Sequence, residues 1–333
     1  MISSHYALVQ EQAGVHDALP PTLDDGQPNP FAGQAHRRVL VTGGTGFIGK
    51  HAVRAMLDVG HAVTVLSRHP IQAARLFGGR ARAVHSLDQL SADDVFDCVV
   101  NLAGAPVVGR LWSRSRRATL HQSRIGTTDA LIAWVQRTRH RPAMWVQASA
   151  IGAYGVREPD EVIDETSATG SGFMSQLCLD WEASARPATE LGVRQVVLRL
   201  GLVFGRGGAL PMMVAPYRMG LGARLGDGRQ IMSWIHLDDV LGLIAQAFDR
   251  ESMRGIYNAV APDPVPQAEF AERVAKLLGR PLFLRVPAPP LRLLAGEMGQ
   301  LFLDGQRVMP AKLLANDYPF LFPTLQQALE DLI

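Results

Sequence analysis

Residues 39–50 read Val-Leu-Val-Thr-Gly-Gly-Thr-Gly-Phe-Ile-Gly-Lys, and this stretch decides the fold. An apolar β-branched run ends at Thr42, glycines follow, and an apolar stripe of helical period begins at Ile48. The pattern predicts a strand, a tight turn and a helix. Gly44, Gly46 and Gly49 fit the Gly-x-Gly-x-x-Gly spacing of loops that hold a dinucleotide pyrophosphate at a helix N-terminus. The alternative is an ordinary glycine-rich turn.

The composition limits the classes of protein to which the chain can belong. The chain has 333 residues, with 33 Lys and Arg against 31 Asp and Glu, and 47% of the residues are hydrophobic. This balance is typical of a globular chain and creates no field that would attract a nucleic acid. The two cysteines, Cys98 and Cys178, do not have the spacing of a metal site or a disulfide framework. We therefore expect no metal, no nucleic-acid partner and a reducing compartment.

The sequence contains no apolar run near the roughly 20 residues of a membrane span. The N-terminus also lacks a basic region followed by an apolar one, the pattern of a secretory signal. We expect a cytoplasmic protein without membrane contact, and a symmetric homodimer is the default oligomeric state.

Strand and helix signals alternate along the rest of the chain. We expect strands at 62–66, around Val84, and at 98–104, 143–148 and 194–199, with helices that include 112–139 and 172–191. This alternation predicts an α/β fold, a Rossmann doubly wound parallel sheet with helices on both faces. Met and Gly are frequent in 209–236, so we expect a substrate-covering lobe there rather than a regular core. Asp238 or Asp239 is expected to cap the helix that follows.

These signals divide the chain into three expected segments. Residues 1–36 hold four acidic residues and four prolines but no Lys or Arg, and we expect a disordered extension. Residues 37–205 are expected to form the nucleotide-binding Rossmann domain. Residues 206–333 are expected to complete the sheet and to form a small C-terminal α+β substrate lobe.

The end of the second strand indicates the type of dinucleotide. Sites for NAD place Asp or Glu about 20 residues beyond the glycines, whereas sites for NADP place Arg there, beside the 2′-phosphate. This chain has Ser67-Arg68-His69 and no acid. A guanidinium suits a phosphate because its planar fork donates two parallel hydrogen bonds. We predict NADP(H), against the alternative that Arg68 is a solvated loop residue.

Two hydroxyl groups follow the expected fifth strand. Ser149 and Tyr154 lie in Ser-Ala-Ile-Gly-Ala-Tyr, at the carboxyl end of the sheet, where such folds keep their active sites. We predict that Tyr154, helped by Ser149, protonates a carbonyl oxygen; the alternative is a strand-end hydroxyl and a packed aromatic ring. The basic cluster Arg110, Arg114, Arg116 and Arg117 is either a solvated face or a site for a phosphate-bearing substrate.

Several motifs resemble one protein family. They are Thr-Gly-Gly-Thr-Gly-Phe-Ile-Gly from Thr42, Asn-Leu-Ala-Gly from Asn101, Ser-Arg-Ile-Gly-Thr-Thr from Ser123 and Ser-Trp-Ile-His-Leu-Asp-Asp from Ser233. Together they resemble the atypical, extended short-chain dehydrogenases/reductases of the NAD(P)-dependent epimerase/dehydratase superfamily. Gly-Asp-Gly-Arg-Gln from Gly226 and the stretch 303–313 are similar to its "epimerase family protein" subgroup, also labelled cell-division-inhibitor-like. The resemblance runs from about Arg38 to the C-terminus.

The resemblance implies a seven-stranded Rossmann sheet, NADP(H) as the cofactor and a set of residues that bind it. These are Gly43, Thr45, Gly46, Phe47, Ile48, Gly49, Ser67, Arg68, Leu102, Ala103, Gly104, Arg124 and Val203. Ser67 and Arg68 would hold the 2′-phosphate, and Leu102 and Ala103 would lie beside the adenosine and ribose.

One motif departs from the family pattern. The wider superfamily uses Tyr-x-x-x-Lys, in which the tyrosine transfers a proton and the lysine lowers its pKa. This chain reads Phe173-Met-Ser-Gln-Leu177 there, and a phenylalanine cannot exchange a proton. The sequence therefore leaves two alternative functions open. The first is an NADP(H)-dependent oxidoreductase or epimerase-like enzyme acting on an unidentified small molecule; the alternative is a non-catalytic NADP(H)-binding redox sensor.

Overall fold

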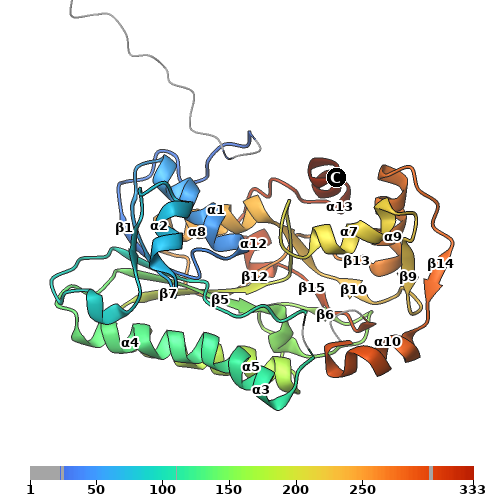
Figure 1. Cartoon of the computed structure of the whole chain (residues 1–333), viewed down its shortest axis with the longest axis horizontal. Helices are drawn as coiled ribbons and strands as arrows, with labels where there is room; N and C mark the ends of the chain where they lie inside the picture. Colours follow the sequence, from blue (N-terminus) through green and yellow to red (C-terminus); the bar gives the residue numbers. More distant parts are fainter. Residues whose placement is uncertain (1–22, 24–25, 110, 300–302) are drawn as a thin grey trace, which may run out of the picture.

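The centre of the molecule is a parallel sheet, shown in Figure 1. The structure, a computed structural model, describes residues 23, 26–109, 111–299 and 303–333. In these residues the sheet has seven strands in the order β12-β7-β5-β4-β1-β2-β3, and neighbouring strands are parallel. The strands are β1 (Arg38–Thr42), β2 (Ala62–Leu66), β3 (Arg82–Val84), β4 (Cys98–Asn101), β5 (Met144–Ala150), β7 (Arg194–Leu200) and β12 (Gly255–Ala259). The predicted doubly wound Rossmann sheet is confirmed.

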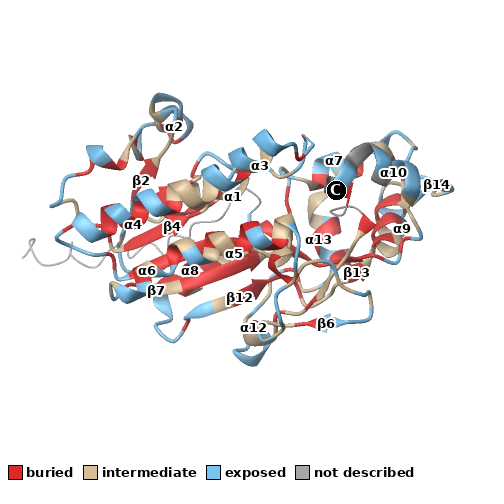
Figure 2. Cartoon of the chain, turned by 90° about the horizontal axis from the view of Figure 1, so that it is seen from below, coloured by how far each residue is buried: buried red, intermediate tan, exposed pale blue. Residues whose placement is uncertain are grey.

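Helices cover both faces of this sheet (Figure 1). One face carries α1 (Phe47–Asp58), α2 (Pro70–Leu76) and α8 (Leu237–Asp249), and the other carries α4 (Thr127–Arg137), α5 (Phe173–Ala185) and α6 (Pro187–Glu190). Strand residues alternate between the two cores, since Val39 and Val41 pack with α1 and α8 whereas Leu40 packs with α4. The strands of the sheet are largely buried in Figure 2, and the outer faces of the helices are exposed. No described helix has the length and apolarity needed to cross a bilayer.

The C-terminal part forms a lobe at the carboxyl end of the sheet (Figure 1). Its helices are α7 (Leu210–Arg218), α9 (Gln267–Leu277), α10 (Ala288–Ala295) and α13 (Leu325–Leu332), whereas α12 (Ala311–Ala315) packs on the sheet, with Leu313 in the core beside α8. The short strands outside the central sheet form pairs: β6 (Val162–Ile163) with β15 (Arg307–Val308), β8 (Leu202–Phe204) with β11 (Trp234–His236), β9 (Ala223–Leu225) with β14 (Leu284–Val286), and β10 (Ile231–Met232) with β13 (Val265–Pro266). The described residues also form short 3-10 helices, η1 (Leu87–Gln89), η3 (Ile151–Tyr154) and η4 (Gly296–Gly299).

The lobe has a core of its own, which corrects one expectation. The segment 209–236 was expected to lack a regular core, but Trp234 is fully buried and stacks on Phe204 at 5.6 Å between ring centroids. Tyr217 and Phe270 extend the same cluster. The prediction was wrong because these aromatic residues pack against α9 and α13, which lie far away in the sequence.

The N-terminal segment is packed over part of its length, which corrects a second expectation. Residues 1–36 were expected to be disordered, yet Phe31 is 0% exposed and lies edge-on to Phe248, with 5.6 Å between ring centroids. Asn29 Nδ2 donates a hydrogen bond of 2.8 Å to Ala55 O, and Gln34 Nε2 donates to Ala245 O. Residues 26–36 therefore pack on α1 and α8. Residues 1–22, 24 and 25 lie outside the described residues, as does Arg110 of the basic cluster.

Two local predictions also need correction. The helix expected over 112–139 consists of α3 (Arg114–His121), a π-helical turn η2 (Gln122–Gly126) and α4. The cap of α8 is His236, whose Nδ1 accepts the Asp238 N–H at 3.2 Å, and not an aspartate. Asp239 instead accepts the backbone N–H groups of Leu321 and Phe322, at 2.8 and 3.1 Å.

Candidate functional site

The glycine loop joins β1 to α1 in the predicted way. Gly43 has a φ of +68°, and a Cβ on it would lie 2.4 Å from Leu102 O. A Cβ on Gly49 would lie 2.2 Å from Gly43 O, so the loop and the helix touch without room for side chains. The first turn of α1 has neither an acidic residue nor a side-chain cap. Its N–H groups and the helix dipole therefore suit an anion such as a pyrophosphate.

The end of β2 lies beside this loop. Thr42 pairs with Leu66, so Ser67 and Arg68 follow at the level of the glycines. Ser67 is half-buried and Arg68 is exposed. Among the residues that the structure describes, none forms a hydrogen bond or ion pair with the Arg68 guanidinium. The group is therefore available to a phosphate.

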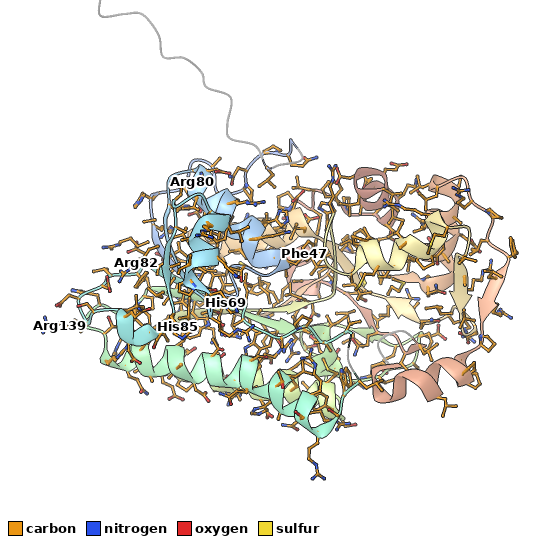
Figure 3. The ribbon with its side chains drawn as sticks, in the orientation of Figure 1. Phe47, His69, Arg80, Arg82, His85 and Arg139 are labelled. Atoms are coloured by element: carbon orange, nitrogen blue, oxygen red, sulfur yellow. The ribbon has the colours of Figure 1, made fainter. Side chains whose placement is uncertain are left out.

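Two histidines at the same end were not predicted as site residues. His69 follows Arg68, and its N–H donates to Ser67 Oγ at 3.2 Å. His85 follows β3, whose last residue, Val84, accepts the Ser67 N–H at 2.9 Å. Figure 3 labels both side chains, near α2 and the ends of β2 and β3. His85 lies one residue and His69 three residues past the end of a paired strand, a signal that sequence reasoning did not use.

The end of β4 meets Arg124. Leu102, Ala103 and Gly104 follow the strand, and a Cβ on Gly104 would lie 2.9 Å from Arg124 Cζ. The guanidinium donates to Ala105 O and Leu120 O at 3.2 and 3.3 Å and lies over the Trp181 ring. Burial lowers the pKa of Arg124. In the described chain no carboxylate pairs with it, which suits a ligand carrying negative charge or hydroxyl groups.

A buried polar ladder fixes these strand ends. Thr42 Oγ1 donates to Asn101 Oδ1 at 2.5 Å, and Asn101 Nδ2 donates to Thr128 Oγ1 and Gln147 Oε1 at 2.8 and 2.9 Å. Thr128 lies one turn after Arg124 and accepts the Trp181 indole N–H at 3.2 Å. The ladder joins β1, β4, β5 and α4, so it holds the glycine loop and Arg124 in a fixed relation.

Ser149 lies near the end of β5 in a buried charge network. Its Oγ donates to Glu182 Oε1 at 2.6 Å. Arg199, from β7, donates to both Glu182 oxygens at 2.8 Å. Ser149 and Arg199 are 2% and 3% exposed. Burial alone would lower the pKa of Arg199, but the hydrogen bonds and the charge of Glu182 raise it above its ordinary value. Sequence reasoning missed Glu182 and Arg199; a charged residue within an apolar strand was the available signal.

Tyr154 belongs to the same network but is directed away from Ser149. Its side chain is 0% exposed, and its hydroxyl donates to Asn258 Oδ1 at 2.7 Å. The Arg199 guanidinium lies over its ring, 4.7 Å from the centroid. Burial raises the pKa of the Tyr154 phenol. The structure thus brings Ser149 and Tyr154 together around Arg199, with both hydroxyl groups bonded inside the protein.

Phe173 and Leu177 are surrounded by apolar groups. The Phe173 ring lies 5.4 Å from the Trp112 ring, and the Arg117 guanidinium lies over it at 4.8 Å. Leu177 is buried in the same cluster. This end of α5 therefore offers a hydrophobic surface and no proton donor of its own at these two positions.

Val203 lies in β8, opposite Ile235 of β11, and leads to the turn Gly205–Gly208. This turn packs on Phe47, the first residue of α1, because a Cβ on Gly205 would lie 2.7 Å from Phe47 Cζ. Figure 3 shows Phe47 at the end of α1 nearer the lobe. A hollow of about 560 Å³ lies at the opposite, amino-terminal edge of the sheet, where Arg37 and Arg194 line it. None of the predicted site residues lines that hollow.

Residues 39–259, from β1 to the end of β12, match the model of the NAD dependent epimerase/dehydratase family. The chain belongs to this family. A second match, to a domain of unknown function (DUF1731), covers residues 286–332 and hence α10, α12 and α13.

Several relatives match over 89% of the chain. The mouse epimerase family protein SDR39U1 is 37% identical over 300 residues, covering 89% of this chain and 99% of its own. The Staphylococcus saprophyticus epimerase family protein SSP1921 is also 37% identical, with the same coverage. The crystal structure of human epimerase family protein SDR39U1 (isoform 2) with NADPH has a TM-score of 0.79 and 35% identity, covering 89% of this chain and 98% of the human one. The family assignment therefore confirms the resemblance to atypical short-chain dehydrogenases/reductases.

Proposed function

We propose that the chain binds NADP(H) along the carboxyl edge of the sheet. The glycine loop and the first turn of α1 would hold the pyrophosphate, and Ser67 and Arg68 would hold the 2′-phosphate. The main observation is that Arg68 and Arg124 border this edge and have no carboxylate partner in the described chain. A 35% identical human relative was crystallised with NADPH, which supports the proposal.

Leu102, Ala103, Gly104 and Val203 would complete the cofactor contacts. Small residues after β4 would let a ligand lie across the strand ends. The Arg124 guanidinium lies beside them, since a Cβ on Gly104 would be 2.9 Å from Arg124 Cζ. A fluorescence titration of the purified protein with NADPH and NADH tests the assignment. We expect NADPH to bind at least about tenfold more tightly, a difference of about 1.4 kcal/mol. The absence of binding by either nucleotide would refute the proposal.

We further propose that the chain is an oxidoreductase or epimerase-like enzyme acting on a small molecule, in which Ser149 transfers the proton. Bound NADP(H) would supply or accept the hydride. When an alcohol is oxidised, Ser149 Oγ takes the hydroxyl proton while its own proton passes 2.6 Å to Glu182. The two hydrogen bonds from Arg199 hold Glu182 in place to receive it. The reverse path returns the proton when a carbonyl is reduced.

Tyr154 would then act through Arg199 instead of touching the substrate. Its hydroxyl is bonded to Asn258, and its ring supports the guanidinium that holds Glu182. This assignment differs from the prediction made from the sequence, in which Tyr154 is the proton donor. Removing the Ser149 hydroxyl and the Tyr154 hydroxyl in separate variants distinguishes the two assignments, because each assignment expects a different variant to lose turnover.

A second function, a non-catalytic reporter of NADP(H) redox state, is favoured by one observation. Both candidate hydroxyl groups are buried and donate within the protein, and Phe173 and Leu177 supply no proton donor. Single-turnover mixing of bound NADPH with a panel of aldehydes, ketones and nucleotide-sugars separates the functions. Oxidation by any compound, above the rate without protein, would exclude the reporter; unchanged NADPH throughout is the result expected of it.

A further inference from the structure

The Gly205–Gly208 turn supports the start of α1. Added Cβ atoms on Gly205, Gly207 and Gly208 would lie 2.7, 3.1 and 2.7 Å from atoms of the Phe47 ring. Glycines at these positions therefore let the turn lie flat against the ring. Phe47 is the first residue of α1, so a shift of this turn would move the helix end that faces the anion.

The C-terminal helix α13 holds the same turn. Arg206 Nη2 donates to Asp331 O at 3.2 Å. The strand before the turn pairs with β11 so that Phe204 lies opposite His236. His236 Nε2 lies 3.4 Å from the Asp331 carboxylate. Asp331 thus contacts the turn through its carbonyl and the neighbouring strand through its side chain.

His236 is buried and its ring orientation is fixed. Its Nδ1 accepts the Asp238 N–H, so in the neutral ring Nε2 carries the proton and points toward Asp331. Its ring lies on Phe322, with 3.8 Å between centroids. Asp239, in the first turn of α8, holds the backbone at Leu321 and Phe322. The segment 321–331 is therefore fastened to α8 at two places.

A small cavity of about 80 Å³ lies at this junction. The charged and titratable residues that line it come from α1, the turn, β11 and α8: His51, Arg54, Asp58, Arg206, His236 and Asp238. A junction with internal space can shift, whereas a close-packed one cannot. The contacts of Asp331 with Arg206 and His236 therefore help to determine the position of the turn on Phe47.

We propose that Asp331 and His236 are positioning residues for the cofactor: they dock α13 on the Gly205–Gly208 turn and so hold Phe47 and the first turn of α1 in the binding geometry. This inference rests on the proposed binding of NADP(H). It gives a role to the end of the chain, the part that matches a domain of unknown function. The affinity for the dinucleotide then depends on a helix that begins at Leu325, far from the glycine loop in sequence.

Two substitutions of Asp331 separate positioning from mere folding. Asp331→Ala removes the carboxylate that lies 3.4 Å from His236 Nε2, whereas Asp331→Asn keeps a carbonyl oxygen there that a neutral histidine can bond. Glu330→Ala is the matched control, because Glu330 is exposed and bonds only Gln326 of its own helix in the described chain. Each purified variant is titrated with NADPH by fluorescence, well below its melting temperature.

We expect NADPH to bind Asp331→Ala about fivefold or more weakly, and the other two variants to stay within about twofold of the wild type. The proposal is overturned if the alanine variant keeps wild-type affinity, or if the asparagine variant is equally weakened. Hydrogen exchange of the protein without nucleotide is a second measurement. Faster exchange in 43–50 and 204–209 of Asp331→Ala supports the coupling even if the wild type binds no NADPH; unchanged exchange contradicts it.

Discussion

Arg199 binds Glu182 through two hydrogen bonds of 2.8 Å, and the carboxylate that they hold also accepts the Ser149 hydroxyl. A guanidinium and a carboxylate paired in this fork geometry have little freedom, and their side chains are 4% and 11% exposed. The direction of the Ser149 proton is thus set by residues from β7 and α5. The same residues would determine where a substrate proton goes.

Removing the Ser149 hydroxyl should stop proton transfer. Ser149→Ala is expected to lower the single-turnover rate of hydride transfer by about 10²–10⁴, the usual contribution of a positioned proton-transfer group. Its NADPH affinity should stay near the wild-type value. Ser175→Ala is the matched control, because Ser175 is buried nearby but donates to Ala153 O. If Tyr154→Phe abolishes turnover and Ser149→Ala does not, the sequence-based assignment of Tyr154 is right.

Arg68 should determine the preference for NADPH. Arg68→Ala is expected to weaken NADPH binding by about tenfold or more, because the 2′-phosphate loses a bidentate charged partner, and to leave NADH binding unchanged. Arg80→Ala is a suitable control, since Arg80 is an exposed arginine that precedes β3, at the opposite edge of the sheet, and pairs with Asp58. Equal losses for both nucleotides would show that Arg68 acts on the fold and not on the 2′-phosphate. Paired fluorescence titrations give the answer.

Phe31 should stabilise the whole domain. Phe31→Ala is expected to lower the free energy of unfolding by about 3–5 kcal/mol, the usual cost of removing a fully buried phenylalanine side chain. Ile71→Ala, at a side chain that is 69% exposed, should change it by less than about 0.5 kcal/mol. Urea unfolding of both variants measures the difference. A loss under about 1 kcal/mol for Phe31→Ala would mean that residues 26–36 are only loosely attached.

Asp239 should make stability depend on pH. Burial raises the pKa of its carboxyl from 3.8 to about 6, although the N–H groups of Leu321 and Phe322 favour the ionised form. The folded chain therefore binds this proton more tightly than the unfolded chain does. The resulting stabilisation is complete below the unfolded pKa and is lost as pH rises through about 6.

Urea unfolding between pH 4 and pH 7 tests this linkage against Asp239→Asn, which has no proton to lose. The stability of the wild type relative to the variant should fall with rising pH, by up to about 1.4 kcal/mol per pH unit. Asp249→Asn, at the other end of α8, controls for the loss of an acidic residue. If the difference in unfolding free energy between the wild type and Asp239→Asn stays constant across this pH range, the assigned pKa is contradicted.

The local parts of the fold were predictable because their signals are contiguous in sequence. β1, the glycine loop and α1 follow from the change of apolar period at Thr42 and the glycines after it. The position of Arg124 facing the strand ends follows from helical spacing to Thr128, which the structure buries against Asn101. Arg68 was identified because it stands where an acidic residue would otherwise be expected.

The missed features depend on contacts between distant residues. Glu182 lies 33 residues from Ser149, so nothing near either residue predicts their bond. His236 caps α8 although Asp238 and Asp239 are stronger local candidates, because the helix begins at Leu237 and both aspartates lie inside its first turn. Phe31 lies in a proline-rich, acidic stretch, and its ring packs edge-on against His61 and Phe248, which are distant in sequence.

The strand order has a consequence for synthesis on the ribosome. β12 pairs with β7, but the chain reaches β12 only after α7, the β8 and β11 pair and α8 have been made. A nascent chain that ends before Gly255 has β7 as an open edge, with buried-type residues and unpaired backbone groups. Such an edge is a template for association with other chains. Expression of truncated forms should therefore yield aggregates unless the C-terminal boundary lies beyond Ala259.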